Sequence, residues 1–136
     1  MDDVARIKAI VKSIFDAFIA HDTTAGDRLY TRDATVWDVF EPQLFRGPED
    51  RAKFRKADQA QMQKRGKLTL TTEDPVVSVW SDAAIARYYL KFKYEPPNAT
   101  EGHVRITDVL RKVDGTWLIV HHHEGMVPQG IPPIHE

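Results

Sequence analysis

Residues 103–124 read HVRITDVLRKVDGTWLIVHHHE, and this stretch decides the fold class. Apolar and polar side chains alternate on both sides of Asp114-Gly115, a pair that is typical of a two-residue turn between antiparallel strands. We therefore predict one strand over 103–113 and a second over 116–124, joined by this turn. Because successive side chains of a strand point to opposite faces, the turn also predicts which residues share a face.

The predicted turn pairs Val113 with Thr116, and counting back from that pair places Asp108 opposite His121. The count assigns to one face the residues Ile106, Asp108, Leu110, Trp117, Ile119, His121 and His123. This face is apolar except at one end, which favours a face covered by helices. A carboxylate and two imidazoles at the mouth of an apolar face predict a small-molecule pocket.

We interpret Asp108 and His121 as a candidate catalytic acid/base pair. Directly opposed residues have Cβ atoms about 4.5–5.5 Å apart, so the carboxylate can orient the imidazole. The pair also fits a structural ion pair across the strands, and a register slip of one residue would separate the two side chains. A further interpretation is a zinc or iron site at His121, His123 and Asp108. We predict that the site holds no metal and that the protein uses no cofactor.

Several other side chains are predicted to bind the substrate at this pocket: Trp37, Asp38, Tyr88, Ile119 and His123. Asp38 lies in the middle of a predicted strand over 35–40, where a carboxylate is costly unless it is paired or exposed. It is therefore either a pocket base or a solvent-facing residue. Tyr88 and Tyr89 are neighbours on a strand, so one of them can line the pocket while the other packs outside.

The remainder of the chain predicts helices first and strands afterwards. Apolar residues at three- and four-residue steps predict an amphipathic helix over 4–19, followed by a second, short helix within 23–29. Gly47-Pro48-Glu49-Asp50 opens a helix that ends near residue 63, and its thin apolar face favours a place on the outside of the fold. We expect further strands over 67–79, bent at Asp74-Pro75, and over 83–94. This order predicts an α+β domain with helices on one face of a curved antiparallel sheet.

The composition narrows the classes of function. The chain has 136 residues, the size of one domain over 1–136, with an extended tail over 125–136. Nineteen basic residues oppose 20 acidic ones, which argues against nucleic acid as a partner, and the absence of cysteine excludes thiol chemistry. No apolar run approaches the roughly 18 residues that span a membrane. The acidic start does not resemble a signal peptide, so we expect a cytoplasmic protein with no membrane partner.

The last two predicted strands resemble those of SnoaL-like domains in the nuclear transport factor 2-like, or ketosteroid isomerase-like, superfamily. That pattern is a strand, an Asp-Gly turn, a tryptophan, a strand ending in His-x-His, a small residue and a proline. The residues that match it are Asp114, Gly115, Trp117, His121, His123, Gly125 and Pro128. Phe40-Glu41-Pro42, and Gly47 at the start of a helix, resemble the family's first strand and its connection. The subgroup most similar to the chain contains the association domain of calcium/calmodulin-dependent kinase II.

The resemblance implies a cone-shaped curved sheet, packed against a long N-terminal helix and shorter helices, that encloses a pocket. It also implies a homodimer formed through the outer surface of the sheet. The first helix offers Phe15 and Phe18 where ketosteroid isomerases use a tyrosine, and Leu90 and Asp108 occupy positions at which association domains carry arginines. An acid at Asp108 is similar to the pocket carboxylate of the isomerases and cyclases.

Members of this superfamily include cofactor-independent isomerases, cyclases and dehydratases, and also modules without catalysis. The resemblance and the predicted Asp108–His121 pair together predict a cofactor-independent acid/base enzyme that acts on a small apolar molecule. The alternative is a non-catalytic module for ligand binding or homo-oligomerisation. Its interface would be built from the opposite face of the last two strands.

Overall fold

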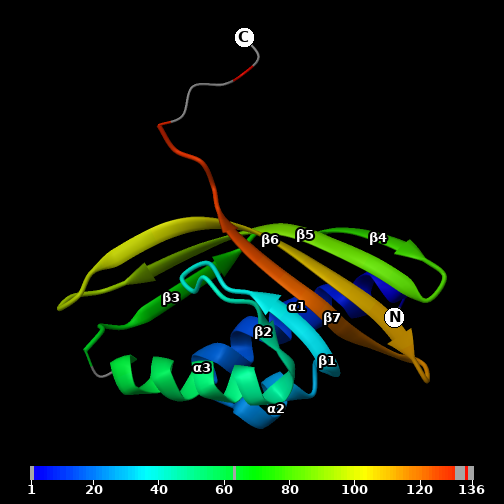
Figure 1. Ribbon diagram of the computed structural model, residues 1–136. Helices are drawn as coiled ribbons and strands as arrows, with labels where there is room; N and C mark the ends of the chain where they lie inside the picture. Colours follow the sequence, from blue (N-terminus) through cyan, green and yellow to red (C-terminus); the bar gives the residue numbers. More distant parts are fainter. Residues whose placement is uncertain (1, 63, 131–133, 135–136) are drawn as a thin grey trace.

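Three helices occupy the first half of the chain in the computed structural model, which describes residues 2–62, 64–130 and 134 (Figure 1). Their bounds are α1 (Asp3–Ala20), α2 (Thr23–Asp27) and α3 (Gly47–Met62). The Asp2 carboxylate caps α1 by accepting a hydrogen bond of 2.7 Å from the Ala5 N–H. The helix ends at His21, whose backbone is left-handed, with a φ of 56°. The predicted helix over 4–19 is thus confirmed.

The strands form one mixed sheet. Their bounds are β1 (Tyr30–Trp37), β2 (Phe45–Arg46), β3 (Leu68–Thr72), β4 (Val76–Trp80), β5 (Ala83–Tyr94), β6 (Thr100–Val113) and β7 (Thr116–Met126). The strand order is β2-β1-β7-β6-β5-β3, with β4 also paired to β5. The pairs are antiparallel except that β1 runs parallel to β7. The predicted α+β fold is therefore confirmed, with one parallel pair that the sequence did not indicate.

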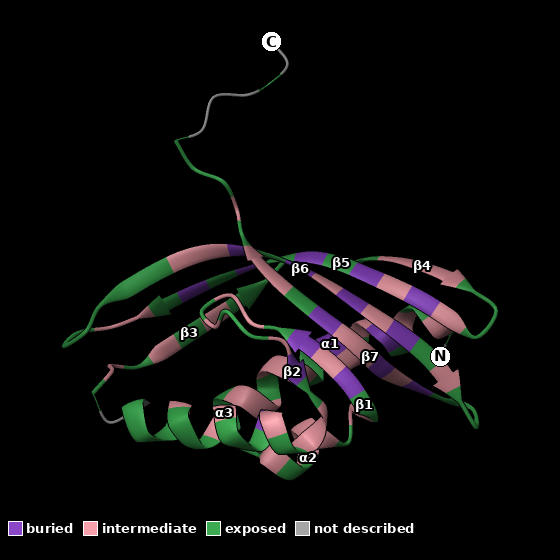
Figure 2. Ribbon diagram, in the orientation of Figure 1, coloured by how far each residue is buried: buried purple, intermediate pink, exposed green. Residues whose placement is uncertain are grey.

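The sheet curves over the helices, which lie together on its concave side (Figure 1). Buried residues concentrate along β5, β6, β7 and β1 beneath this curve (Figure 2). The fully buried residues Ile7 and Val11 of α1 belong to the same apolar cluster as Leu110 of β6 and Ile119 of β7. Burial of each such side chain stabilises the fold by about 1.5–3 kcal/mol, so the cluster holds α1 against the sheet.

The hairpin between β6 and β7 begins as predicted. Asp114 and Gly115 have φ values of 50° and 80°, which the two central residues of a type I′ turn require. The register is also as predicted from the turn as far as the pair of Leu110 with Ile119. The residues predicted to face inward along β6 and the first part of β7 are buried: Ile106, Asp108, Leu110, Trp117 and Ile119.

A β-bulge then changes the register. Val109 pairs with His121, so Val120 is an extra residue in β7, and Asp108 pairs with His122. The predicted pairing of Asp108 with His121 is therefore wrong. One inserted residue exchanges the faces of every side chain that follows it, and His122 faces the interior in place of His121.

Other boundaries differ from the predictions by a few residues. β1 ends at Trp37, so Asp38 follows the strand and does not lie within it. The predicted strand over 67–79 is divided into β3 and β4, with the break beside Asp74-Pro75. β7 continues to Met126, so residues 125 and 126 of the predicted tail belong to the sheet. Positions 131–133, 135 and 136 of that tail lie outside the described residues.

Candidate active site

A buried carboxylate, Asp108, is at the centre of the concave face. It points inward from β6 and is 0% exposed. The Tyr88 hydroxyl, from β5, donates a hydrogen bond of 2.5 Å to its Oδ2, and its Oδ1 bonds to Nδ1 of His122 from β7. Each neighbouring strand therefore supplies one partner, and a buried charge without such partners would cost several kcal/mol.

His122 connects this carboxylate to a second one. Its Nε2 lies 2.9 Å from Oε2 of Glu124, two residues further along the same face of β7. An ionised carboxylate only accepts hydrogen bonds, so both ring nitrogens of His122 carry protons and the ring is cationic. Burial by itself lowers the pKa of His122, but the Asp108 charge and the two hydrogen bonds outweigh it and raise that pKa well above its ordinary value.

Asp38 lies beside Glu124 at the end of β1. Burial and the Glu124 charge raise the pKa of Asp38 to about 7. Burial also raises the pKa of Glu124. Two contacts outweigh it and lower that pKa: the hydrogen bond with His122 and the Val39 N–H, which donates to Oε1 at 3.2 Å. Two adjacent carboxyl groups therefore have pKa values that are shifted in opposite directions, a pattern typical of an acid/base site.

Two further interior residues lie close to these groups. Burial raises the pKa of Tyr30, at the start of β1, and the charges of His122, Asp108, Glu124 and Arg51 also act on its hydroxyl. The guanidinium carbon of Arg51, from α3, lies 4.8 Å from the centre of the Tyr30 ring. We call the set Tyr88, Asp108, His122, Glu124 and Asp38 the interior relay; Tyr30 and Arg51 flank it.

The structure separates the predicted site residues into two groups. Asp108, Tyr88 and Ile119 are buried on the concave side, and Asp38 lies at its edge. The other three lie on the convex side: His121, His123 and Trp37. His121 Nδ1 is 2.7 Å from the Thr35 hydroxyl, and the His123 ring is 6.5 Å from that of Trp37. The prediction that these three join Asp108 in one pocket is wrong: the bulge at Val120 turns His121 and His123 outward, and Trp37 of β1 lies beside His123.

The alternative metal site fails for the same reason. Asp108 lies on the face opposite to His121 and His123, so the three cannot share an ion. Within residues 2–62, 64–130 and 134, no group of three or more histidine, aspartate or glutamate side chains has the geometry of a metal site.

Within the same residues, no helix is long and apolar enough to cross a membrane.

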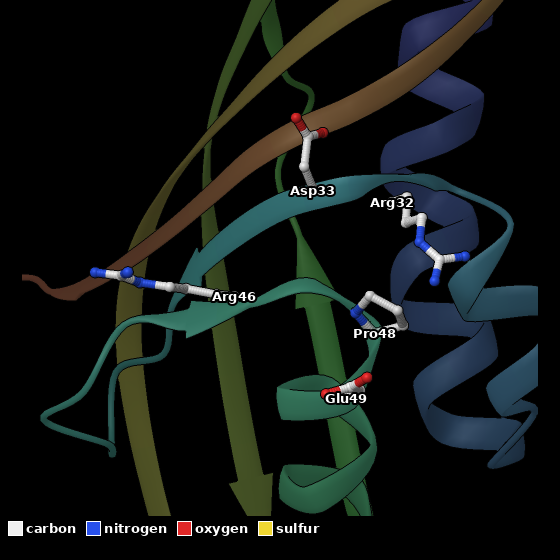
Figure 3. Close-up of a pocket in the computed structure, with 5 residues that line it drawn as sticks. All are labelled: Arg32, Asp33, Arg46, Pro48 and Glu49. Atoms are coloured by element: carbon white, nitrogen blue, oxygen red, sulfur yellow. The ribbon is translucent and has the colours of Figure 1, made fainter.

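Two surface hollows lie outside the concave interior, and Tyr88 of the interior relay also lines the second of them. Figure 3 shows the first, beside β1, β2 and the start of α3, lined by Arg32, Asp33, Arg46, Pro48 and Glu49. Its charged side chains point in different directions and converge on no common point (Figure 3). The second is a groove of about 510 Å³ against the convex side of β5, β6 and β7. Its lining includes Arg87, Tyr89, Arg105, Thr107 and His123.

The fold places the chain among α+β proteins whose helices lie within a curved sheet, and solved structures share this fold. A candidate dehydratase of the NTF2-like family from Streptomyces avermitilis has a TM-score of 0.75 and 17% identity, over 93% of this chain and 98% of that one. A candidate ketosteroid isomerase from Shewanella frigidimarina has a TM-score of 0.73 and 21% identity, over 86% and 92%. A candidate calcium/calmodulin-dependent kinase II association domain from Xanthomonas campestris has a TM-score of 0.68 and 21% identity, over 88% and 86%.

The sequence itself fixes the family. The SnoaL-like domain matches residues 7–128, so the chain belongs to the SnoaL-like domain family, and the resemblance of the last hairpin is confirmed. No curated protein matches the chain significantly. Identities of 21% or less show the fold alone, so the site must be interpreted from its own chemistry.

Sequence reasoning missed four residues of this region: His122, Glu124, Tyr30 and Arg51. One signal was present, since His122 and Glu124 are two residues apart and so share a face of any strand. The bulge that turns this face inward has no marker such as glycine at position 120.

Proposed function

We propose that the chain is a cofactor-independent enzyme that transfers a proton at a carbon atom next to a carbonyl group, as isomerases, cyclases and dehydratases do. One observation carries this proposal: a chain of hydrogen-bonded titratable groups runs from Tyr88 through Asp108 and His122 to Glu124 and ends beside Asp38. A network that only stabilises the fold does not require, at one end, a carboxyl group whose pKa lies near 7.

Asp38 is the proposed proton-transferring group. With a pKa of about 7, it is present in both protonation states at neutral pH, which is the condition for general acid/base catalysis. Its carboxylate would take a proton from the carbon, the electron pair of the broken C–H bond would move to the carbonyl oxygen, and the proton would return at the same or another carbon. Glu124, held ionised by His122, keeps the proton affinity of Asp38 high throughout.

Apolar side chains beside Asp38 support an apolar substrate. Val39 is half-buried, and the exposed Phe40 ring lies 5.6 Å from the Phe92 ring in an edge-to-face contact. Deeper in the fold, the Phe15 ring of α1 contacts Tyr88 with a centroid distance of 6.1 Å. Aromatic rings therefore stand at both ends of the interior relay.

The test is exchange of carbon-bound hydrogen for deuterium, followed by proton NMR in D₂O for a panel of apolar ketones. We expect exchange catalysed by the wild type, with a rate that rises as the pH rises through about 7 because Asp38 must be ionised to accept a proton. Asp38→Asn should lower the rate by about 10²–10⁴-fold. Asp33→Asn, an exposed carboxyl on β1, is the matched control and should leave it unchanged. Equal rates for the wild type and Asp38→Asn would contradict the proposal.

A second function, homodimer formation, is favoured by the convex groove. Its lining joins two basic residues, Arg87 and Arg105, with two acidic ones, Glu73 and Asp74, beside the exposed Tyr89 ring. A surface that carries both signs of charge can be complementary to a second copy of itself. Sedimentation equilibrium should show a dimer that Arg105→Glu converts to a monomer, while Arg111→Glu, outside the groove, should not. A monomeric wild type at micromolar concentration would exclude this function.

A further inference from the structure

The interior contains a cation whose hydrogen-bonding groups are unused. The Arg51 side chain is 9% exposed, and its Nε and Nη1 are buried without a hydrogen-bond partner among the described residues. A buried polar group in this condition costs about 1–3 kcal/mol, and a charged one more. Such a group is expected where a bound molecule supplies the hydrogen-bond acceptor.

The nearest carboxylate does not supply it. Oδ1 of Asp27 lies 3.5 Å from Arg51 Nε, an ion-pair contact without hydrogen-bond geometry. The two oxygens of Asp27 instead accept hydrogen bonds of 2.9 and 3.2 Å from Arg55. Two guanidinium groups thus share one carboxylate, which leaves a net positive charge at Arg51.

The guanidinium of Arg51 has an aromatic ring against one face. It lies over the Tyr30 ring, at 4.8 Å. Phe54 follows three residues later on the same face of α3, and its ring lies 5.1 Å from that of the buried Phe45. An anion that reached these donors would meet one positive charge within an apolar wall.

We propose that Arg51 binds the carboxylate of an aromatic or otherwise apolar organic acid, with Tyr30 as the ring beneath it. A singly charged carboxylate fits better than a doubly charged phosphate, because only one positive charge is left uncompensated. Tyr30 also lies close to both sites, since its ring lies against the Arg51 guanidinium and its strand pairs with β7, the strand of His122. The inference rests on the proposed function for the identity of the reacting groups and narrows its substrates: apolar carbonyl compounds that also bear a carboxylate should exchange faster than the uncharged ketones.

The test compares two probes of equal shape, phenylacetate and its neutral amide, phenylacetamide. Isothermal titration calorimetry on the full chain should show at least tenfold tighter binding of phenylacetate by the wild type. Arg51→Gln should abolish this preference. Lys53→Gln, which removes one exposed charge from the same helix, should keep it. Equal binding of the two probes, absence of phenylacetate binding, or a preference that survives in Arg51→Gln would overturn the inference.

A second measurement uses the wild type, so its result does not depend on whether a variant folds. The Nε–H signal of Arg51 in the proton–nitrogen NMR spectrum of the wild type should shift on addition of phenylacetate and stay in place with phenylacetamide; a signal that ignores both probes counts against the inference. Asp38→Asn separates the two proposals, because it should bind phenylacetate as the wild type does while it loses deuterium exchange. If carboxylate binding persists and no exchange is found in any variant, the proposed function fails and the binding site remains.

Discussion

Three consecutive histidines of β7 occupy two different environments. His122 is 3% exposed, has a carboxylate on each ring nitrogen and carries a raised pKa. His121 and His123 lie on the convex face, where burial and the His123 charge lower the pKa of His121. The residue type and the strand are the same, so the difference arises from the face alone. The concave face therefore holds the buried titratable groups, and the convex face exposes histidines in a different electrostatic environment.

The largest difference between the faces should appear when Asp108 is replaced. Asp108→Asn leaves the His122 cation buried without one of its two counter-charges, and we expect a loss of about 3–5 kcal/mol in the free energy of unfolding. Urea denaturation measures it. The control is Thr107→Val, at the neighbouring position on the convex side, which should change stability by less than about 1 kcal/mol. Equal losses for the two variants would remove the distinction.

A smaller difference is expected from one substitution placed on each face. His122→Gln removes hydrogen bonds to two carboxylates and should cost about 2–3 kcal/mol. His123→Gln changes an exposed ring and should stay within about 0.5 kcal/mol. The same denaturation experiment compares them directly. A larger loss for His123→Gln would mean that the convex face is buried in a stable assembly.

The finest test uses pH, because the two faces respond with opposite sign. The raised pKa of His122 makes a contribution to stability that is complete below about 6.5, the value of the unfolded chain, and is lost as the pH rises through the folded value. The lowered pKa of His121 disfavours its protonation, so that stability is lost as the pH falls below about 6.5 through the folded value. NMR titration of the imidazole nitrogens should show His122 protonated at a pH where His121 is neutral. Titration of both rings at one pH would contradict the assignment.

The sequence predicted most of the fold because local signals agreed there. The periodicity of residues 4–19 and the turn at Asp114-Gly115 each specify an element without outside help, and the alternation from Ile106 to Ile119 was confirmed. Within the hairpin, the predicted register was wrong beyond the bulge. That bulge sits where β1 joins β7 in parallel, a contact between segments about 85 residues apart that no local pattern reports.

Arg51 was beyond prediction for a related reason. The helix predicted from residue 47 to near residue 63 was expected on the outside of the fold because its apolar face is thin, and that pattern does not single out Arg51. Its burial depends on Tyr30 and on the competition of Arg55 for Asp27, which only the assembled fold brings about.

The pairing of β1 with β7 also sets the order in which the protein can be completed. The Ile119 N–H donates to the Leu29 carbonyl at 2.8 Å, and the Thr35 hydroxyl meets His121, so the edge of the sheet closes between distant parts of the chain. Contacts of such sequence separation slow folding. A nascent chain on the ribosome can therefore pair β1 with β2, but the other side of β1 has no partner strand until the last strand emerges. Asp38 and Glu124 meet only then, so a truncated or stalled chain has no assembled relay.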